Sequence, residues 1–239
     1  MTLDRRDFLT LGGVASLAAL GPRLVELAHA RPAGQPASAA QRWGLLIDAD
    51  QCAEGCDACV AACGKENGFH STGHPESDPQ WIRKVELKDM QTGHTATLPV
   101  MCQHCESPPC VDVCPTGASF RRADGIVLVD KHICIGCRYC MMACPYKARS
   151  FVHEDVHEQK PDVPRGKGTV ESCTLCVHRV DRDQIPACAE ACRQAGHEAI
   201  LFGDLLDPSS AIRQRLTEQD STALRADLKL NPSVRYQGM

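Results

Sequence analysis

The sequence has few aromatic residues, no excess of positive charge and no recognisable substrate motif. Ten aromatic residues in a chain of 239 imply that something other than large side chains fills part of the interior. The formal net charge of -4 provides no basic patch for phosphate contacts, which argues against nucleic acid as a partner. The chain has no Gly-rich phosphate loop, serine nucleophile elbow or paired carboxylate motif, so no catalytic site is evident.

The first thirty residues have the features of an export signal. Arg5 and Arg6 precede an apolar, uncharged run from Leu9 to Leu20, and Ala28-His29-Ala30 has the form of a cleavage site. A transmembrane anchor would need about twenty apolar residues, and this run is shorter. The arginine pair resembles the twin-arginine signal, which exports proteins already folded around their cofactors. We therefore expect cleavage after Ala30 and a periplasmic mature protein.

Cysteine is the residue that the sequence has in excess, and all sixteen cysteines fall into four quartets. Cysteines two or three residues apart bring their thiols toward one point, which suits a metal or cluster better than long-range disulfides. The third quartet has the spacing Cys-x2-Cys-x2-Cys-x3-Cys-Pro of the bacterial ferredoxin run, which binds [4Fe-4S] clusters. The quartets are Cys52, Cys56, Cys59 and Cys63; Cys102, Cys105, Cys110 and Cys114; Cys134, Cys137, Cys140 and Cys144; and Cys173, Cys176, Cys188 and Cys192.

Two other uses of the cysteines stay open at this point, a disulfide framework and structural zinc. Exported proteins with an even number of cysteines are normally disulfide-bonded, but a framework has no reason to repeat tight quartets. All-cysteine zinc sites usually pair two Cys-x2-Cys knuckles and lack the Cys-Pro ending. Covalent c-type haem has no attachment site, because no Cys-x2-Cys pair is followed directly by His. Iron-sulfur clusters are therefore the favoured interpretation.

The segments around the quartets predict an α+β fold of short strands and helices. Apolar runs rich in Leu, Ile and Val predict strands that lead into the first and third quartets. Helical turns are favoured after the third cysteine of the same quartets. Two runs that flank Gln91-Thr92-Gly93 predict a hairpin, interpreted as an inserted β element. We predict strands at residues 43–48, 81–87, 95–100, 125–130 and 199–202, a helix at residues 209–218 and an extended tail at residues 231–239.

The quartets, their order and three further phrases resemble the four-cluster electron-transfer subunits of the dimethyl-sulfoxide-reductase and polysulfide-reductase type. The phrases are Pro108-Pro109-Cys110, Cys114-Pro115-Thr116-Gly117-Ala118 and Cys144-Pro145-Tyr146-Lys147-Ala148-Arg149. The match covers nearly all of the mature chain, and quartets two, three and four have the family's spacing without change. The resemblance implies two ferredoxin-like dicluster modules that pass single electrons, in a chain that is not itself an enzyme.

The ligand pattern of the family, carried onto this chain, implies four [4Fe-4S] clusters. Each cluster takes three cysteines from one quartet and the last cysteine of another. The implied ligand sets are Cys52/Cys56/Cys59/Cys192, Cys173/Cys176/Cys188/Cys63, Cys102/Cys105/Cys110/Cys144 and Cys134/Cys137/Cys140/Cys114. The expected organisation is a signal peptide (1–30), a flexible lead (31–41), a first dicluster module (42–63 plus 170–205), an inserted β element (64–100), a second dicluster module (101–150), a loop (151–169), and a C-terminal helix and tail (206–239).

Two departures from the family pattern fall in the first module. The spacing Cys52-x3-Cys56 contains an additional residue, and Arg193 follows Cys192 where relatives often have proline. Because hydrogen bonds, charge and exposure set the potential of a cluster, we expect this module to have shifted potentials, without a predicted sign.

The same cysteine spacing, with Gly64-Lys65-Glu66-Asn67 and Trp81-Ile82-Arg83-Lys84, resembles one subgroup of the family. This subgroup is the exported iron-sulfur subunit of the membrane complex associated with dissimilatory sulfite reductase. The resemblance implies two partners: an integral membrane quinol-interacting subunit, and a cytochrome or catalytic redox subunit. Attachment to the membrane is expected through these partners.

A few other residues match functional patterns. His153, Glu154 and His157 have the H-E-x-x-H spacing of zinc hydrolases, but that motif needs a helix and a third ligand, and here two prolines follow, so a solvated loop is predicted. Arg121-Arg122 is predicted to be a solvated pair. Three histidines beside cluster cysteines are predicted to pack or to be exposed rather than to bind metal: His104, His132 and His178.

Overall fold

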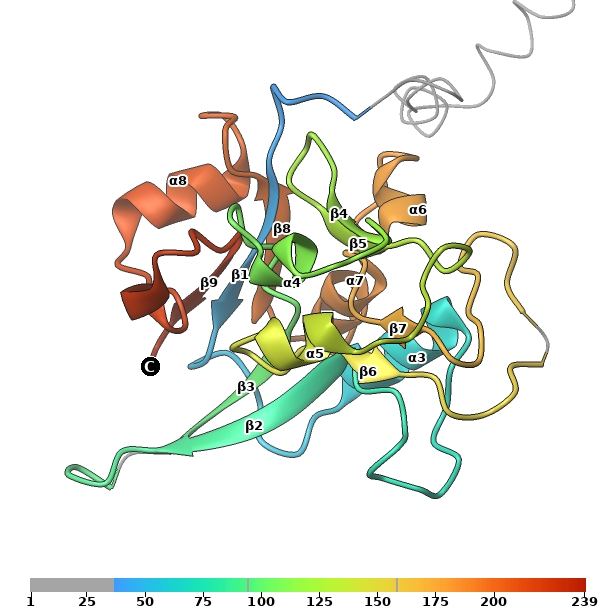
Figure 1. Cartoon of the computed structure of the whole chain (residues 1–239). Helices are drawn as coiled ribbons and strands as arrows, with labels where there is room; N and C mark the ends of the chain where they lie inside the picture. Colours follow the sequence, from blue (N-terminus) through green and yellow to red (C-terminus); the bar gives the residue numbers. More distant parts are fainter. Residues whose placement is uncertain (1–36, 94, 158) are drawn as a thin grey trace, which may run out of the picture.

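The chain repeats one local pattern four times: a strand, then a loop that carries cysteines, then a short helix (Figure 1). In each repeat the first cysteine of a quartet follows the strand within a few residues, so strand ends set where the cysteine loops begin. The strands are β1 (Trp43–Asp48), β3 (Thr95–Met101), β5 (Val127–Val129) and β7 (Val170–Glu171). The helices are α3 (Ala58–Asn67), α4 (Pro109–Asp112), α5 (Tyr139–Ala143), and α6 (Val177–Val180) with α7 (Ala187–Gln194).

The structure is a computed structural model that describes residues 37–93, 95–157 and 159–239. The predicted export signal (1–30) and the first residues of the predicted lead lie outside these ranges. The described chain contains both short helices and short strands, often in strand pairs, which agrees with the α+β class that the sequence predicts. Among the described helices, none has the length and apolar character needed to cross a membrane.

Strand β1 is the centre of a three-stranded sheet with the order β8-β1-β9. Its residues Leu45, Leu46 and Ile47 are almost completely buried, as expected for a strand covered on both faces. Strand β8 (Ile200–Asp204) pairs with β1 antiparallel, and β9 (Val234–Gln237) pairs with it parallel. Helix α8 (Ala211–Glu218) packs on β8 through Ile212, which has no exposed surface.

The segment predicted as an extended tail is instead part of this sheet. Within residues 231–239, Val234 and Tyr236 have no exposed surface and β9 lies beside β1. Parallel pairing joins strands that are distant in sequence, and local sequence patterns carry no sign of it. The 3-10 turn η1 (Ala226–Leu228) lies on the path from α8 to β9.

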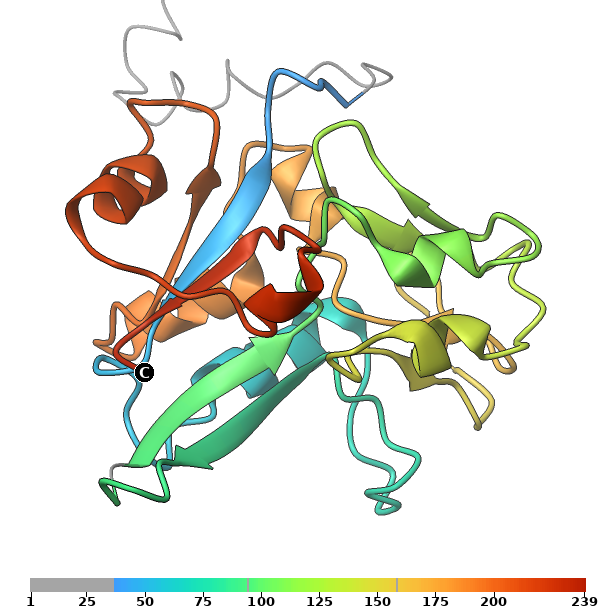
Figure 2. The ribbon, with the colours of Figure 1, turned by 60° about the vertical axis from the view of Figure 1, so that its left-hand side comes forward.

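Strands β2 (Ile82–Lys88) and β3 form a long hairpin whose far end projects from the rest of the molecule (Figures 1 and 2). Asp89 organises the turn: its carboxylate accepts the N–H of Gln91 at 2.7 Å, and its carbonyl accepts the N–H of Gly93 at 2.9 Å. At the near end, Leu98 and Met101 are fully buried. The hairpin therefore delivers the chain into the core one residue before Cys102.

Two short strand pairs complete the fold. Strand β4 (Ser119–Arg121) pairs with β5, and β6 (Ser150–Phe151) pairs with β7. Figure 2 shows α4, α5, β4 and β5 together on one side of the molecule, and the β8-β1-β9 sheet with α8 on the other. The main hydrophobic core between them contains cysteines as well as aliphatic side chains. These cysteines are Cys59, Cys63, Cys102, Cys105, Cys144, Cys173, Cys188 and Cys192.

Candidate functional site

Each cysteine loop has a residue with positive φ directly before the second cysteine of its quartet. These residues are Gly55 (φ 75°), His104 (43°), Gly136 (69°) and Leu175 (54°). A left-handed residue turns successive backbone N–H groups toward the inside of a loop, which creates a concavity suited to anionic groups. The additional residue of the first quartet does not disturb this arrangement, because Gly55 still precedes Cys56.

Four pairs of cysteines lie four residues apart at the short helices. This spacing corresponds to about 6 Å along a helix axis, so the two thiols of a pair can serve two neighbouring sites. Helix α3 packs on α7, and α4 packs on α5. The pair on α3 therefore lies near the pair on α7, and the pair at α4 lies near the pair at α5. The pairs are Cys59 and Cys63 on α3, Cys188 and Cys192 on α7, Cys110 and Cys114 at α4, and Cys140 and Cys144 at α5.

Two groups of four cysteines each line a small pocket. Both pockets combine three cysteines of one quartet with the last cysteine of another. We name them site I, lined by Cys52, Cys56, Cys59 and Cys192, and site III, lined by Cys102, Cys105, Cys110 and Cys144.

The remaining cysteines are neighbours in two further groups. Burial raises the pKa of Cys63 well above its usual value, and Cys188 and Cys176 raise it further; the pKa of Cys173 is raised by burial and then by Cys63 and Cys188. We name this group site II: Cys63, Cys173, Cys176 and Cys188. Burial raises the pKa of Cys140, Arg149 acts in the opposite direction, and Cys114 and Cys134 raise it further. We name Cys114, Cys134 and Cys140, together with Cys137 from the loop between Cys134 and Cys140, site IV.

The four sites follow one another in a single line. Cys59 of site I acts on the pKa of Cys63 and Cys188 in site II, Cys102 of site III acts on Cys173 of site II, and Cys140 of site IV acts on Cys110 of site III. The order is therefore I, II, III, IV.

Exposure differs between the middle and the ends of this line. All eight cysteines of sites II and III are buried. Site I has two partly exposed thiols, Cys52 and Cys56. In site IV, Cys114 and Cys134 are partly exposed and Cys137 is exposed. The line of sites thus runs through the interior and reaches the surface at both ends.

The chemistry of the donors fits an iron-sulfur cluster at each site. Burial, followed by neighbouring thiols, raises the pKa of Cys59 to about 11 and that of Cys105 to about 12. Such thiols become thiolates only when a cationic centre lies between them, and a metal ion deprotonates a coordinating thiol outright. No group of three or more His, Cys, Asp or Glu side chains in the described ranges is arranged to hold a single metal ion.

Backbone and side-chain groups donate hydrogen bonds to the cysteine sulfurs. Backbone N–H groups of Ser119, Val170 and Leu175 donate to the Sγ atoms of Cys114, Cys134 and Cys173, at 3.3, 3.5 and 3.4 Å. At site III the donor is a side chain, since Nη2 of Arg149 lies 3.0 Å from Sγ of Cys110. Donors of this kind stabilise thiolate sulfur and influence the potential of a bound cluster.

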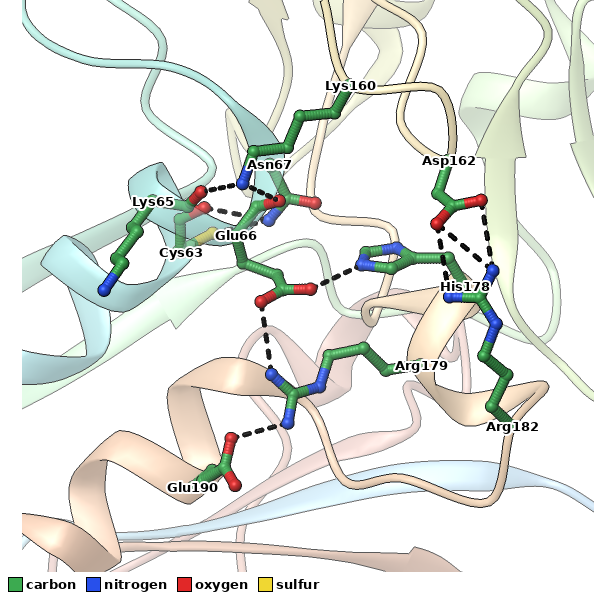
Figure 3. Close-up of polar contacts among 10 residues, drawn as sticks. All are labelled: Cys63, Lys65, Glu66, Asn67, Lys160, Asp162, His178, Arg179, Arg182 and Glu190. Atoms are coloured by element: carbon green, nitrogen blue, oxygen red, sulfur yellow. Dashed lines mark hydrogen bonds and ion pairs between the residues drawn. The ribbon is translucent and has the colours of Figure 1, made fainter. Parts of the chain in front are cut away.

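A polar network lies near Cys63 of site II (Figure 3). Glu66 on α3 binds Nε2 of His178 at 2.8 Å and Nη1 of Arg179 at 3.2 Å, and Arg179 also binds Glu190 on α7 at 2.5 Å. Asn67 donates its amide to the carbonyl of Cys63 at 2.9 Å. The network joins α3, α6 and α7, the three helices that carry or adjoin the cysteines of this site. Sequence reasoning missed it, because its members come from segments far apart in the chain and no local pattern connects them.

The histidines beside the cysteines are packed or exposed. His104 is buried and its Nδ1 accepts the N–H of Val127 at 3.0 Å, and burial, with the charge of Arg149, lowers its pKa to about 3, so the ring stays neutral. His132 is exposed, and His178 packs against Glu66.

The H-E-x-x-H segment forms an exposed loop. His153, Glu154 and His157 are exposed and lie outside any helix. Two ligands one helical turn apart are therefore not available, and the prediction of a solvated loop is confirmed.

The prediction of a solvated pair was wrong for Arg122. Its side chain is only 16% exposed and binds the buried carboxylate of Asp124 at 2.6 Å and Asp181 at 2.7 Å. These bonds connect the β4–β5 hairpin to the end of α6. Arg122 therefore has a structural role, which local sequence could not indicate because Asp181 is distant in the chain.

Comparisons with known proteins identify the family of the chain. Residues 94–204 match the family model of the 4Fe-4S dicluster domain. The chain is 40% identical to the Hdr-like menaquinol oxidoreductase iron-sulfur subunit 1 of Archaeoglobus fulgidus, over 98% of this chain and 97% of the relative. It is 36% identical to a subunit of the tetrathionate reductase of Salmonella typhimurium (100% and 90% covered) and 36% identical to protein NrfC of Escherichia coli (98% and 95% covered).

The fold and the cysteine sites therefore define an iron-sulfur protein that carries [4Fe-4S] clusters. More specifically, the chain belongs to the family of iron-sulfur electron-transfer subunits of oxidoreductase complexes, of the dimethyl-sulfoxide-reductase and polysulfide-reductase type. Members of this family are electron-transfer subunits and not the catalytic subunits of their complexes.

Proposed function

We propose that the chain holds four [4Fe-4S] clusters, one at each of sites I to IV, and relays electrons between a membrane quinol-interacting subunit and a second redox subunit. The observation that carries this proposal is the single line of sites, buried in the middle and accessible at the ends. A bound cluster supplies one-electron transfer. The side chains hold each cluster, exclude water from sites II and III, and fix the order of the centres.

The accessible ends support exchange of electrons with partners. At site IV, Cys137 is exposed and is flanked by the exposed side chains of Ile135, Tyr139 and Met142. At site I, Cys52 and Cys56 are partly exposed. A redox centre of another subunit can approach a cluster at either end without rearrangement of the buried middle.

The nature of the partners is inferred from the relatives. One of them is named as a subunit of a menaquinol oxidoreductase, and another as a subunit of tetrathionate reductase. These names support a quinol-linked complex in which a membrane subunit lies on one side of this chain and a cytochrome or catalytic subunit on the other. The proposed setting is a respiratory or sulfur-metabolising complex.

The proposed location is the periplasm, reached by the twin-arginine route. It is supported by the arginine pair at positions 5 and 6 and by the cleavage pattern that ends at Ala30. The N-terminal sequence of protein purified from its native host tests it. A mature chain beginning at Arg31 in the periplasmic or membrane fraction is expected, and an uncleaved chain in the cytoplasm contradicts it.

Iron and acid-labile sulfide, measured on anaerobically purified protein, test the number of clusters. About sixteen iron atoms per chain are expected for four [4Fe-4S] clusters. About eight would mean that only one pair of sites is occupied, and zinc or disulfides in place of iron would overturn the proposal. All sixteen cysteines lie in the described part of the chain and are free, which does not favour the disulfide alternative.

A direct test of the relay uses membranes that contain the complex. Addition of a reduced menaquinone analogue should bleach the cluster absorbance of this subunit. Bleaching should be lost when the membrane subunit is removed and retained when the second redox subunit is removed.

A further inference from the structure

Arg149 is a buried cation that lies between sites III and IV. The residue is 6% exposed. Its Nη2 donates to Sγ of Cys110 at 3.0 Å and to Oγ of Ser119 at 2.8 Å. Its charge acts on the thiols of Cys102 and Cys110 in site III and of Cys140 in site IV. The side chain thus reaches both sites from one position.

The backbone places Arg149 there through a turn that follows the last cysteine of the third quartet. Lys147 has φ 51°, and its N–H is bonded to the carbonyl of Cys144 at 3.2 Å. After this left-handed residue the chain turns inward, so that Ala148 and Arg149 are both buried. Helix α5 and strand β6, on either side of the turn, hold it in place.

Arg149 differs from Arg165, which is also buried, in what neutralises it. Arg165 has a bidentate bond to the carboxylate of Glu171, with both distances 2.9 Å. Arg149 forms no ion pair with any carboxylate of the described residues, and its buried Nε and Nη1 atoms have no hydrogen-bond partner there. A buried guanidinium is normally paired with an anion, because desolvation of a lone charge is costly.

A bound cluster would supply the negative charge beside Arg149 that no carboxylate of the described residues supplies. A [4Fe-4S] cluster with four thiolate ligands is negatively charged, and it becomes more negative when it accepts an electron. A fixed positive charge beside it, shielded from water, stabilises the reduced form more than the oxidised form. Arg149 interacts most strongly with Cys110 and Cys102 of site III, and also with Cys140 of site IV.

We propose that Arg149 sets the reduction potential of the cluster at site III, and to a smaller extent that at site IV, by holding a permanent positive charge between them. The inference depends on the proposed function, since it requires clusters at these sites. Arg149 is a positioning and tuning residue: it acts through the ligands and takes no part in binding iron. The expected effect is that the cluster at site III is reduced more easily than it would be without this positive charge.

The test is a redox titration followed by electron paramagnetic resonance on the full-length holoprotein, preceded by iron and sulfide analysis of every variant. Arg149→Met removes the charge and keeps an unbranched side chain. With full iron content, one cluster should become harder to reduce by at least a factor of about ten, which is about 59 mV for one electron. Arg149→Lys keeps the charge and should leave that potential within a few-fold of the wild-type value.

Arg193→Met is the matched control. Arg193 directly follows Cys192 of site I, but it is exposed, so solvent screens its charge. Loss of this charge should shift no cluster as far as Arg149→Met does. An equal shift in the two variants would mean that burial of the charge is irrelevant, and it would overturn the inference.

The remaining outcomes also decide the matter. Unchanged potentials in Arg149→Met with full iron overturn the tuning role while leaving the electron relay intact. If Arg149→Met loses a cluster, Arg149→Lys decides: a retained cluster at the wild-type potential supports the charge, whereas a lost cluster or a shifted potential means that the shape of arginine matters and its charge does not. Wild-type protein without iron would instead refute the proposed function itself.

Discussion

Cys173 and Cys102 come from different quartets, and the charge of Cys102 acts on Cys173 across the boundary between sites II and III. Burial raises the pKa of Cys173 well above its usual value, Cys63 and Cys188 raise it further, and Cys102 adds to both. Cys102 directly follows β3 and Cys173 lies two residues after β7, so two strand ends set this junction. In the proposed relay, this junction is where an electron passes between sites II and III.

Cys137→Ser should remove one cluster and leave the rest of the protein intact. Cys137 is the exposed cysteine of site IV, and its loop is at one end of the line of sites. We expect a loss of about four of about sixteen iron atoms, with unchanged far-ultraviolet circular dichroism. Cys63→Ser is the comparison, because Cys63 is buried in site II between two helices. Equal losses of iron and helical signal in both variants would contradict the assignment of Cys137 to an end site.

Gly136→Ala should disrupt site IV more than Gly55→Ala disrupts site I. Both glycines precede the second cysteine of a quartet and have positive φ. A Cβ atom on Gly136 would collide with the carbonyl oxygen of Gly168, whereas a Cβ atom on Gly55 meets nothing within 4 Å. The first variant therefore combines a clash with backbone strain, and the second has only strain of about 1–2 kcal/mol. Iron content is the measurement: Gly136→Ala should lose about one cluster and Gly55→Ala none.

Glu171→Ala should destabilise the protein by about 3–5 kcal/mol, because it leaves Arg165 buried without its partner. The side chains of Arg165 and Glu171 are 8% and 0% exposed. The matched control is Lys167→Ala, which removes an ion pair to Asp155 whose side chains are 55% and 68% exposed. That pair should contribute under about 1 kcal/mol. Denaturant unfolding, followed by circular dichroism and cluster absorbance, measures both, and equal effects would contradict the prediction.

The free energy of unfolding should rise as the pH increases above about 8, because of Lys131. Burial lowers the pKa of Lys131 to about 8, although Glu171 and Cys134 act in the opposite direction. An unfolded lysine titrates near its usual value of 10.5. Between these two values the unfolded chain binds more protons than the folded chain, so stability increases as the pH rises through this window.

The measurement is denaturant unfolding from pH 7 to pH 10. The gain in the wild-type protein should be about 1–3 kcal/mol, and Lys131→Met should lack it. Lys88→Met, at an exposed lysine, serves as the control and should keep it. A wild-type stability that falls steadily over this range, to the same degree in all three proteins, would contradict the assignment.

Features that depend on local sequence could be predicted well. The strand at 43–48 follows from an uninterrupted apolar run, and the structure has β1 at Trp43–Asp48. The helix predicted at 209–218 begins only two residues later, at Ala211, because Ser210 is the residue before its first turn. The cysteine quartets could be identified because their spacing is itself local.

Features that depend on distant contacts could not be predicted. Strand β9 pairs parallel with β1, far away in sequence, and its short run does not reveal this. Two other features also depend on contacts between distant residues: Asp181 neutralises Arg122, and Arg149 lies between two sites. Both depend on burial and on turns such as that at Lys147, which are properties of the folded chain.

The distribution of cysteines along the chain has a consequence for how the protein matures. Sites III and IV take all their cysteines from the continuous stretch between Cys102 and Cys144, whereas sites I and II need Cys173, Cys176, Cys188 and Cys192 as well. During synthesis the second and third quartets are therefore complete before the fourth quartet, which sites I and II also need, has been made. We expect cluster insertion to proceed from sites III and IV to sites I and II, and a shortage of iron to leave the late sites empty first.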